Sequence, residues 1–345
     1  MLALVKKERV RGFSLEQRPV PEPKGDEVLV KTRYAAICGS DIKIFKWVPW
    51  CENVVPALPF IPGHECSGTV VDTGPDVKDV REGDMVAAET HVPCGTCWQC
   101  THDRKHTCLN MELFGHTIDG CFAEYFVIPE SAVRRLPAGF PERAGCLLEP
   151  LGIPLRAVLR GNVAGDTLAV IGCGPIGQLA IGAAKMQKAE LIIALDTNTK
   201  RLELAREMGA TDVLNPSDGP VSEQVLSLTE GNGVGTAIEA SGSVDALREA
   251  LGYVRIGGTV FTIGHPANAL CIDVSPEIVL REVQVTGLFG RRIWDTWDRA
   301  EQAVLSGSMD LEAIVTHTFS LKDHEEAFQT AESGDGCKIL FDIGT

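Results

Sequence analysis

The sequence predicts an α/β protein in which a doubly wound parallel sheet is joined to a mainly β domain. Three observations support this prediction. A chain of 345 residues exceeds the size that one hydrophobic core usually supports. Its first part is rich in short strand-like stretches separated by glycine and proline, and from Asp166 onward strands alternate with helices.

The N-terminal part has the pattern of a compact β barrel. Strand-like, valine-rich stretches occupy residues 27–36, 67–71 and 84–88. Glycine and proline separate them at Pro59, Pro62-Gly63, Gly74-Pro75 and Gly83. This spacing of short strands and turns indicates a mainly β domain.

The second part has the pattern of a parallel sheet covered by helices. Apolar strands are expected at 167–171 and 191–195, and each is followed by a helical stretch, at 178–185 and 200–208. Further strands are expected at 236–239, 259–263 and 283–289. The alternation predicts a doubly wound sheet, and the residues after Phe289 revert to mixed character.

A glycine-rich turn joins the first of these strands to its helix. Gly172-Cys173-Gly174-Pro175-Ile176-Gly177 stands where backbone N–H groups and a helix N-terminus can approach a pyrophosphate. Asp196 ends the next strand 19 residues after Gly177, where a carboxylate can accept hydrogen bonds from both ribose hydroxyls of an adenosine. We therefore expect NAD, because the same carboxylate repels the 2′-phosphate of NADP. Arg201 is expected to flank the adenine.

The charge balance argues against a nucleic-acid partner. Thirty-two basic and 47 acidic side chains give a formal net charge of −15, which repels a phosphate backbone. The sequence contains no long uncharged apolar run and no cleavable signal pattern at its start, so we expect a cytoplasmic protein that binds no membrane. A chain of this length needs no disulfides, and we expect its 12 cysteines to be thiols.

Two groups of residues are candidate zinc ligands. Cys94, Cys97, Cys100 and Cys108 lie in one short loop, and four thiolates close a tetrahedral structural site. The second group is scattered over Cys38, His64, Glu65 and Glu149, as is typical of a catalytic zinc with an open position. Taken singly, Cys38 is equally compatible with a core thiol and Glu149 with a helix-start carboxylate.

Several motifs together resemble one family over essentially the whole chain. They are Cys38-Gly39-Ser40-Asp41, Pro62-Gly63-His64-Glu65, the Cys94 to Cys108 set, Gly120-Cys121-Phe122-Ala123-Glu124-Tyr125, Glu149-Pro150 and the turn from Gly172 to Gly177. The chain resembles the zinc-dependent medium-chain dehydrogenases, in the branch of L-threonine 3-dehydrogenases and sorbitol-type polyol dehydrogenases. Residues 45–50, 105–108 and 290–297 are similar to stretches of the threonine enzymes.

The resemblance implies an NAD-dependent enzyme that oxidises a secondary alcohol on a small substrate. It implies a Rossmann domain at 154–289 inserted into a GroES-like catalytic domain at 1–153 and 290–345, and usually a homo-tetramer. The catalytic zinc is expected on Cys38, His64 and either Glu65 or Glu149, and Ser40 is expected to begin a proton relay. The residues assigned to cofactor binding are Gly172, Gly174, Pro175, Ile176, Gly177, Asp196, Arg201, Ile263, Leu288 and Arg291.

The sequence departs from the threonine enzymes at two positions. Lys43 stands in place of the usual relay histidine, and Arg156 ends the stretch Gly152-Ile153-Pro154-Leu155-Arg156, where the family usually has Gly-Asn-Ala-Val-His. Each is compatible with a surface cation or with a cation that receives a carboxylate, a phosphate or hydroxyls. A different substrate, such as a sugar alcohol, would explain both.

Other substrate contacts are open to two interpretations. His91 is expected either near the substrate or as a structural histidine, and Trp47, Trp50 and Trp294 either as pocket walls or as packing residues. Two non-enzymatic alternatives also exist. An inactive binding protein would not need the intact set of catalytic ligands, and a nucleic-acid zinc finger would need a basic recognition helix.

Overall fold

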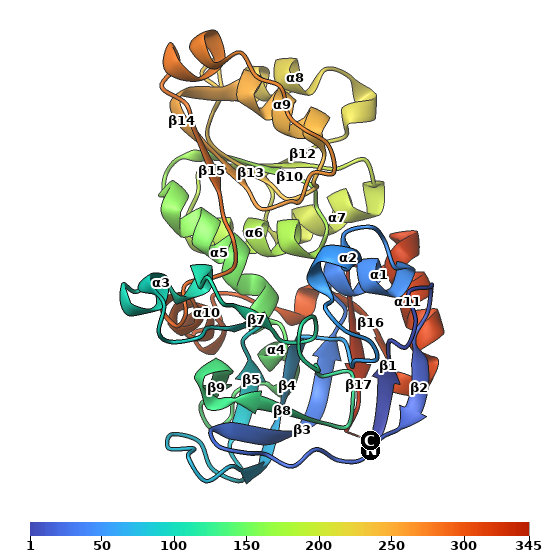
Figure 1. The fold of residues 1–345 in the computed structure, drawn as a ribbon. Coiled ribbons are helices and arrows are strands. Elements are labelled where there is room, and N and C mark those ends of the chain that lie inside the picture. The colour runs from blue at the N-terminus through green and yellow to red at the C-terminus, as the bar shows by residue number, and fades with distance from the viewer. Residues whose placement is uncertain (345) are drawn as a thin grey trace. The chain divides into compact units, whose positions relative to one another are not determined.

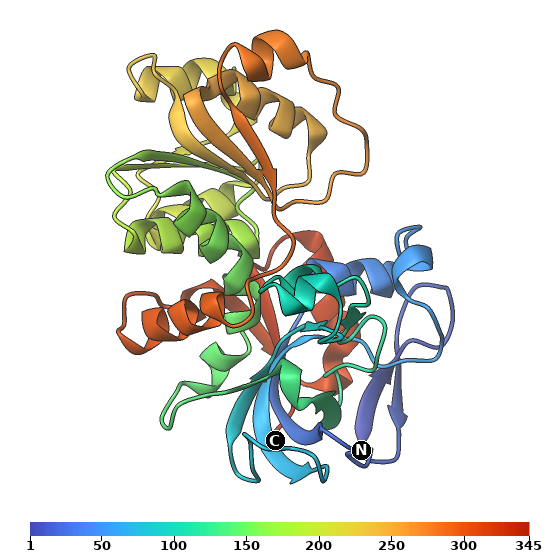
Figure 2. The same cartoon turned by 60° about the vertical axis from the view of Figure 1, so that its left-hand side comes forward.

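The computed structural model describes residues 1–344. The chain forms two compact units, one made of Met1–Glu149 and Val315–Thr345, the other of Pro150–Ile314 (Figures 1 and 2). We refer to them as unit 1 and unit 2. Within residues 1–344, no helix has both the length and the apolar character needed to cross a membrane.

The unit boundaries differ from the expected ones at 153/154 and 289/290. Helix α5 (Leu148–Gly161) begins in unit 1 and continues in unit 2. At the other end, unit 2 continues for 25 residues beyond Phe289, through α10 (Asp295–Leu305) and η5 (Glu312–Ile314). The segment stays with unit 2 because η5 packs on α6 and the Met309 side chain lies beside Gly182 of that helix.

Unit 1 is built around a seven-stranded sheet in the order β16-β17-β3-β4-β5-β9, in which β8 also pairs with β3. Its neighbours are antiparallel except for the parallel pair β16 and β17. The strands of this sheet are β3 (Glu27–Ala36), β4 (Glu65–Thr73), β5 (Met85–Ala88), β8 (Tyr125–Pro129), β9 (Val133–Arg135), β16 (Val315–Phe319) and β17 (Lys338–Asp342). The C-terminal strand β17 therefore lies inside the sheet, beside β3.

The remaining elements of unit 1 are short, apart from two helices. The other strands form two antiparallel pairs, β1 (Leu2–Val5) with β2 (Ser14–Gln17) and β6 (His91–Val92) with β7 (Glu112–Leu113). The helices are α1 (Gly39–Lys46), α2 (Cys51–Val54), α3 (Trp98–Thr101), η1 (Lys105–Thr107), η2 (Glu130–Ala132), α4 (Glu142–Gly145), η6 (Leu321–Asp323) and α11 (His324–Ser333).

Aromatic packing ties the C-terminal helix α11 to the N-terminal part of unit 1. Phe328 of α11 is fully buried and stacks on Phe45 of α1, with ring centroids 4.6 Å apart. Phe13 meets both rings edge to face, with its ring centroid 5.3 Å from that of Phe45 and 5.1 Å from that of Phe328. Such pairs stabilise the fold beyond the area they bury, so this cluster fixes α1, whose first residues belong to the site described below.

Unit 2 is a parallel sheet in the order β12-β11-β10-β13-β14-β15. The strands are β10 (Thr167–Ile171), β11 (Leu191–Leu195), β12 (Asp212–Leu214), β13 (Val234–Glu239), β14 (Val254–Thr262) and β15 (Gln284–Gly287). The helices are α6 (Pro175–Met186), α7 (Thr199–Met208), η3 (Pro216–Asp218), α8 (Val221–Leu228), α9 (Val244–Tyr253) and η4 (Ser275–Val279), together with α5, α10 and η5. The order confirms the expected doubly wound sheet.

Helices cover both faces of this sheet. α6 and α7 lie on one face, and α8 and α9 lie on the other (Figure 1). The central strand β13 is therefore buried along its whole length, including the polar side chains of Thr236 and Glu239. Local signals set the helix ends: Asn198 caps α7 by accepting from the backbone N–H groups of Lys200 and Arg201, and Gly209 ends that helix with a φ of 120°.

Candidate active site and structural metal centre

Three of the predicted zinc ligands meet at one end of adjacent strands in unit 1. Cys38 follows β3 and is the N-cap of α1, and His64 and Glu65 lie at the start of β4. The register of the two strands pairs Ala36 with Glu65. As a result, one donor atom each from Cys38, His64 and Glu65 lies within 4.8 Å of the others.

A close contact between two glycine-containing loops fixes the backbone that carries His64. A Cβ added at Gly120 would lie 2.0 Å from the carbonyl oxygen of Gly63, so this position tolerates only glycine. The same carbonyl accepts from the backbone N–H of Cys121 at 2.9 Å, and the carbonyl of Pro62 accepts from Phe122 at 3.0 Å. The motif that contains Pro62-Gly63 and the one that begins at Gly120 are far apart in the sequence, and their contact fixes the backbone next to the predicted zinc ligand His64.

Asp41 connects the helix cap to the histidine. Its Oδ2 accepts the backbone N–H of Cys38 at 2.9 Å, and its Oδ1 lies 3.6 Å from Nδ1 of His64. The carboxylate is fully buried. A carboxylate behind a metal-binding histidine fixes the orientation of the ring. Asp41 was not among the residues predicted for the site, although it belongs to the quoted Cys-Gly-Ser-Asp motif.

Lys338 is a buried cation in the same place and was missed entirely by the sequence analysis. Its ammonium group forms an ion pair with the Glu65 carboxylate and donates to the carbonyl of Ile37 at 3.1 Å. Burial lowers the pKa of Lys338, but the charges of Glu65, Cys38 and Glu149 outweigh it and raise that pKa above its ordinary value. Lys338 lies 273 residues after Glu65, and only its position in an apolar strand marks it as unusual.

The residues around His64 carry more negative charge than Lys338 can balance. Burial lowers the pKa of His64, but the charges of Asp41, Cys38 and Glu149 raise it to about 10. Such a site attracts a further cation. A thiolate, an imidazole and a carboxylate are the donors that catalytic zinc prefers, and scattered ligands leave one position open. The residues therefore fit a zinc ion held by Cys38, His64 and Glu65.

Glu149 lies outside that three-residue group. Its carboxylate accepts a hydrogen bond from the Thr90 hydroxyl, and its charge still acts on His64 and Glu65. The side chain is buried in the first turn of α5. Its assignment as an alternative zinc ligand stays a prediction.

The other predicted catalytic residues have distinct surroundings. Within residues 1–344, the buried hydroxyl of Ser40 has no hydrogen-bond partner. Nζ of Lys43 lies 5.3 Å from the centre of the Trp50 ring, in a cation–π contact. His91 is buried, and its Nδ1 is 3.0 Å from the Glu89 carboxylate.

His116 is a second histidine that the sequence analysis did not select. Its ring centre is 4.7 Å from that of His64 and 6.1 Å from that of Trp50. Burial, followed by the charge of His64, lowers the pKa of His116 to about 3. The ring is therefore neutral at physiological pH and adds no positive charge beside the zinc ligands.

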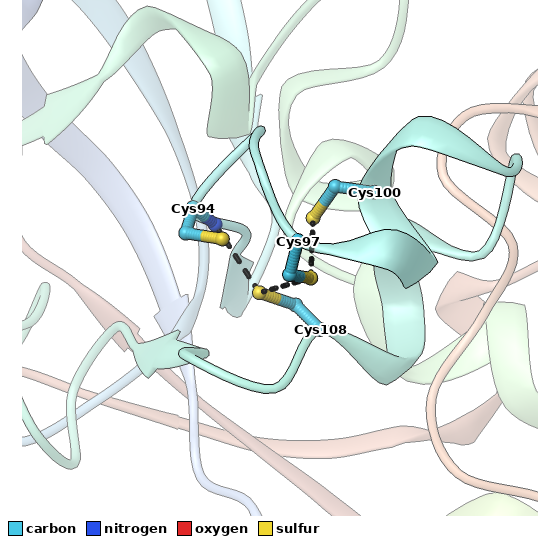
Figure 3. Close-up of side chains that lie close together, drawn as sticks. All are labelled: Cys94, Cys97, Cys100 and Cys108. Atoms are coloured by element: carbon cyan, nitrogen blue, oxygen red, sulfur yellow. Dashed lines mark hydrogen bonds between the residues drawn. The ribbon is translucent and has the colours of Figure 1, made fainter.

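The four cysteines of the second set converge as predicted (Figure 3). They come from the loop before α3, from α3 itself and from the residue after η1. Sγ of Cys97 lies 3.5 Å from that of Cys100 and 3.7 Å from that of Cys108. A disulfide needs about 2.05 Å, whereas thiolates at about 2.3 Å from one zinc ion are about 3.8 Å apart. The set fits a closed structural zinc site.

The glycine-rich turn of unit 2 has the geometry that a dinucleotide site requires. Gly172 has a φ of 90°, and a Cβ on it would lie 2.8 Å from Ser241. A Cβ on Gly177 would lie 1.9 Å from the carbonyl oxygen of Gly172. Gly174 has open space at its Cβ position, and it caps α6, whose first residue is Pro175. The turn therefore leaves the helix N-terminus accessible to a pyrophosphate.

A cavity of about 460 Å³ adjoins this turn. Gly172, Gly174, Asp196 and Arg201 line it, together with the acidic residues Asp245 and Glu249. Asp196 accepts the backbone N–H groups of Cys173 at 2.7 Å and Asn198 at 2.8 Å. Arg201 lies 3.8 Å from the same carboxylate. The three carboxylates of the lining make the cavity unfavourable for an additional phosphate.

Glu239 supports the neighbouring loop and was not predicted. It is fully buried at the end of β13, and its Oε1 accepts from the backbone N–H groups of Ser241 and Gly242, both at 2.7 Å. Ser241 and Ala240 line the cavity. Glu239 thus fixes the loop that faces the glycine turn.

The remaining predicted residues of unit 2 lie outside the lining of this cavity. Ile263 and Leu288 are buried directly after β14 and β15, and Arg291 packs its aliphatic part against Gly152. Trp294 meets Trp297 edge to face, with ring centroids 5.7 Å apart. Arg156 donates to the carbonyls of Phe289 and Gly290. Their cofactor or substrate contacts stay predictions.

Replacing one structural cysteine tests the metal centre. The wild-type protein should contain about two zinc ions per chain, and Cys100→Ser about one, since three thiolates bind zinc more weakly than four. Loss of the metal should lower the melting temperature by at least about 5 °C, because zinc binding contributes to folding free energy. Elemental analysis and thermal unfolding measure both effects.

Cys271→Ser is the matched control for this experiment, because Cys271 is exposed and belongs to neither set. It should retain both metal ions. A Cys100→Ser protein that also keeps two zinc ions would contradict the structural site.

Comparisons with known proteins agree with this geometry. The family described as Alcohol dehydrogenase GroES-like domain matches residues 24–138, and that described as Zinc-binding dehydrogenase matches residues 175–306. An L-threonine 3-dehydrogenase from Bacillus licheniformis is 38% identical over 99% of this chain and 98% of its own.

Two solved structures from Escherichia coli are also similar over 99% of this chain. One is an alcohol dehydrogenase in complex with NADH, with a TM-score of 0.92, 25% identity and 99% of its own chain covered. The other is a galactitol-1-phosphate dehydrogenase, with a TM-score of 0.90, 27% identity and 100% of its own chain covered. The full-length identity, the two family matches and the zinc-ligand geometry agree, and the chain belongs to the zinc-dependent medium-chain dehydrogenase family of nicotinamide-linked alcohol dehydrogenases.

Proposed function

We propose that this protein oxidises the secondary alcohol of L-threonine, or of a closely similar small hydroxylated compound, to a ketone. The observation that carries the proposal is the meeting of the partly buried Cys38 with the buried His64 and Glu65 at a negatively charged position. The threonine substrate is supported by the relative from Bacillus licheniformis, which is 38% identical over nearly its full length.

In this proposal Cys38, His64 and Glu65 hold the zinc ion, and Glu149 provides an alternative carboxylate. When bound, zinc supplies a Lewis acid that lowers the pKa of a hydroxyl group, and NAD supplies the acceptor for a hydride. Asp41 keeps the imidazole of His64 oriented, and Lys338 holds the Glu65 carboxylate through its ion pair.

Ser40 is proposed to take the proton that leaves the alcohol. Its hydroxyl is buried and has no hydrogen-bond partner within the described residues, so it is available to a ligand. Lys43, which replaces the family's usual relay histidine, carries the relay further or receives a polar group of the substrate. His91, Arg156 and Trp294 are proposed as substrate contacts.

A polyol is the alternative substrate. Lys43 and Arg156 depart from the pattern of threonine enzymes, and the similar structure of galactitol-1-phosphate dehydrogenase supports a sugar-alcohol derivative. Both alternatives use the same zinc ligands and the same cofactor.

A panel of alcohols separates the two substrates. NAD reduction should be followed with L-threonine, short diols and four- to six-carbon polyols, and L-threonine should give the highest kcat/KM. A higher value with a polyol would favour the alternative.

Two variants relate the activity to the zinc site. Cys38→Ala should reduce kcat/KM by at least about a thousandfold, because a ligand of the Lewis acid is lost. Cys271→Ala, an exposed cysteine outside both sets, should retain activity. An absence of turnover with every alcohol in the panel would contradict the proposed function.

The acidic cavity predicts a preference for NAD over NADP. Asp196→Ser should lower kcat/KM with NAD by about tenfold and improve the use of NADP, since it removes the ribose acceptor and the charge that repels a 2′-phosphate. Steady-state kinetics with both cofactors measures the ratio. Asp212→Ser, in β12 and outside the cavity lining, is the control and should leave the ratio unchanged. A wild-type preference for NADP would overturn the assignment.

We also propose that the protein is a homo-oligomer, with a tetramer as the form that the family resemblance implies. β15 is an edge strand of the unit 2 sheet. The chain around it exposes large apolar side chains, namely Ile256, Val274, Val279, Leu280, Val285 and Phe289. An exposed apolar sheet edge favours pairing with another chain.

A charge placed on that edge should weaken the assembly. Val285→Lys is expected to shift the particle mass to a smaller species, because a lysine on β15 disfavours strand pairing. Light scattering coupled to gel filtration measures the mass. Val20→Lys changes a side chain of almost the same exposure, 45% against 44%, outside this edge and should leave the mass unchanged. A monomeric wild-type protein would contradict the proposal.

A further inference from the structure

A second cavity in unit 2 is lined mainly by arginine. It has a volume of about 400 Å³ and lies between α5 and α10. Its lining consists of Arg156, Leu159, Arg160, Arg292, Asp295, Thr296 and Arg299. Four guanidinium groups and one carboxylate thus surround a small hollow, in a chain whose formal net charge is −15.

Two helices and one loop supply these four arginines. Arg156 and Arg160 are four residues apart on α5 and share one face of that helix. Arg299 comes from α10, and Arg292 from the loop before it. Arg299 lies 3.7 Å from the Asp295 carboxylate, and both side chains are exposed.

Hydrogen bonds to the backbone fix the Arg156 side chain in place. Arg156 is half-buried, and its Nη1 donates to the carbonyls of Phe289 at 3.1 Å and Gly290 at 3.0 Å. Burial, followed by the positive charges of Arg160 and Arg292, lowers the pKa of Arg156 to about 10. Like charges held this close repel each other, and a bound anion would relieve the repulsion.

We propose that this cavity is a binding site for a phosphate group. Guanidinium groups bind phosphate through paired hydrogen bonds, and several of them are needed to hold a dianion. Thr296, which lines the same cavity in the first turn of α10, adds a hydroxyl at a helix end that favours negative charge. The phosphate belongs either to a free anion that regulates the enzyme or to a phosphorylated substrate.

Titration of the full-length, zinc-loaded protein with inorganic phosphate tests the site. The experiment uses calorimetry at low ionic strength with saturating NADH, so that the glycine turn is already occupied. The wild type should bind phosphate saturably, and Arg160→Gln/Arg299→Gln should weaken binding by about a hundredfold, or about tenfold for each charged hydrogen-bonding group. Asp295→Asn should strengthen binding severalfold, since it removes the carboxylate from the lining.

Arg206→Gln is the matched control, because it removes an exposed arginine of unit 2 that lies outside the cavity. It should leave the affinity unchanged. The absence of saturable binding by the wild type, or equal affinities of the wild type and the double variant, would overturn the proposal.

A kinetic arm distinguishes the two sources of the phosphate. If the group belongs to the substrate, a polyol phosphate should have a lower KM than the free polyol, and Arg160→Gln/Arg299→Gln should abolish the difference. If it belongs to a free anion, the two polyols should have equal KM values and phosphate binding should persist. The calorimetric result does not depend on turnover, so a failure of the proposed oxidation leaves this site testable.

Discussion

The zinc-ligand region depends on one electrostatic constraint, which is that several anionic groups are buried together and need cations. Among the carboxylates, Glu149 acts on Asp41 and on Glu65, and both Asp41 and Glu149 act on His64. Burying unpaired charge is costly, so each carboxylate has a fixed partner: Lys338 for Glu65, the helix cap and His64 for Asp41, and Thr90 for Glu149. A zinc ion held by Cys38, His64 and Glu65 would complete this balance and would supply the Lewis acid for the chemistry.

The elements that could be predicted were those encoded by local patterns. β3, β10 and β11 have the predicted bounds. β10 and β11 are short apolar runs that end directly before Gly172 and Asp196, which leaves little freedom in their limits. The cysteine set and the glycine turn were equally clear because spacing alone defines them. In both motifs, the residues that bind the ligand are close in the sequence, so the fold only has to keep one short segment in shape.

Residues whose roles depend on distant parts of the chain could not be predicted in this way. Lys338 is recognisable as a partner of Glu65 only once β17 is placed beside β3. Unit 2 extends past the expected boundary at Phe289 and includes α10, because helix packing, and not composition, decides where a compact unit ends. The arginine cavity is another case, since Arg156 and Arg299 come from helices separated by most of unit 2.

The internal position of β17 has a consequence for how the protein is made. Because this strand lies between β16 and β3, the unit 1 sheet lacks an interior strand until residues 338–342 have been synthesised. Unit 2, by contrast, is continuous in sequence, and domains that are complete can fold while the rest is still being made. The counter-charge of Glu65 arrives with the same strand, so this carboxylate lacks its partner Lys338 until β17 has joined the sheet, whereas the four cysteines of the loop are all synthesised much earlier.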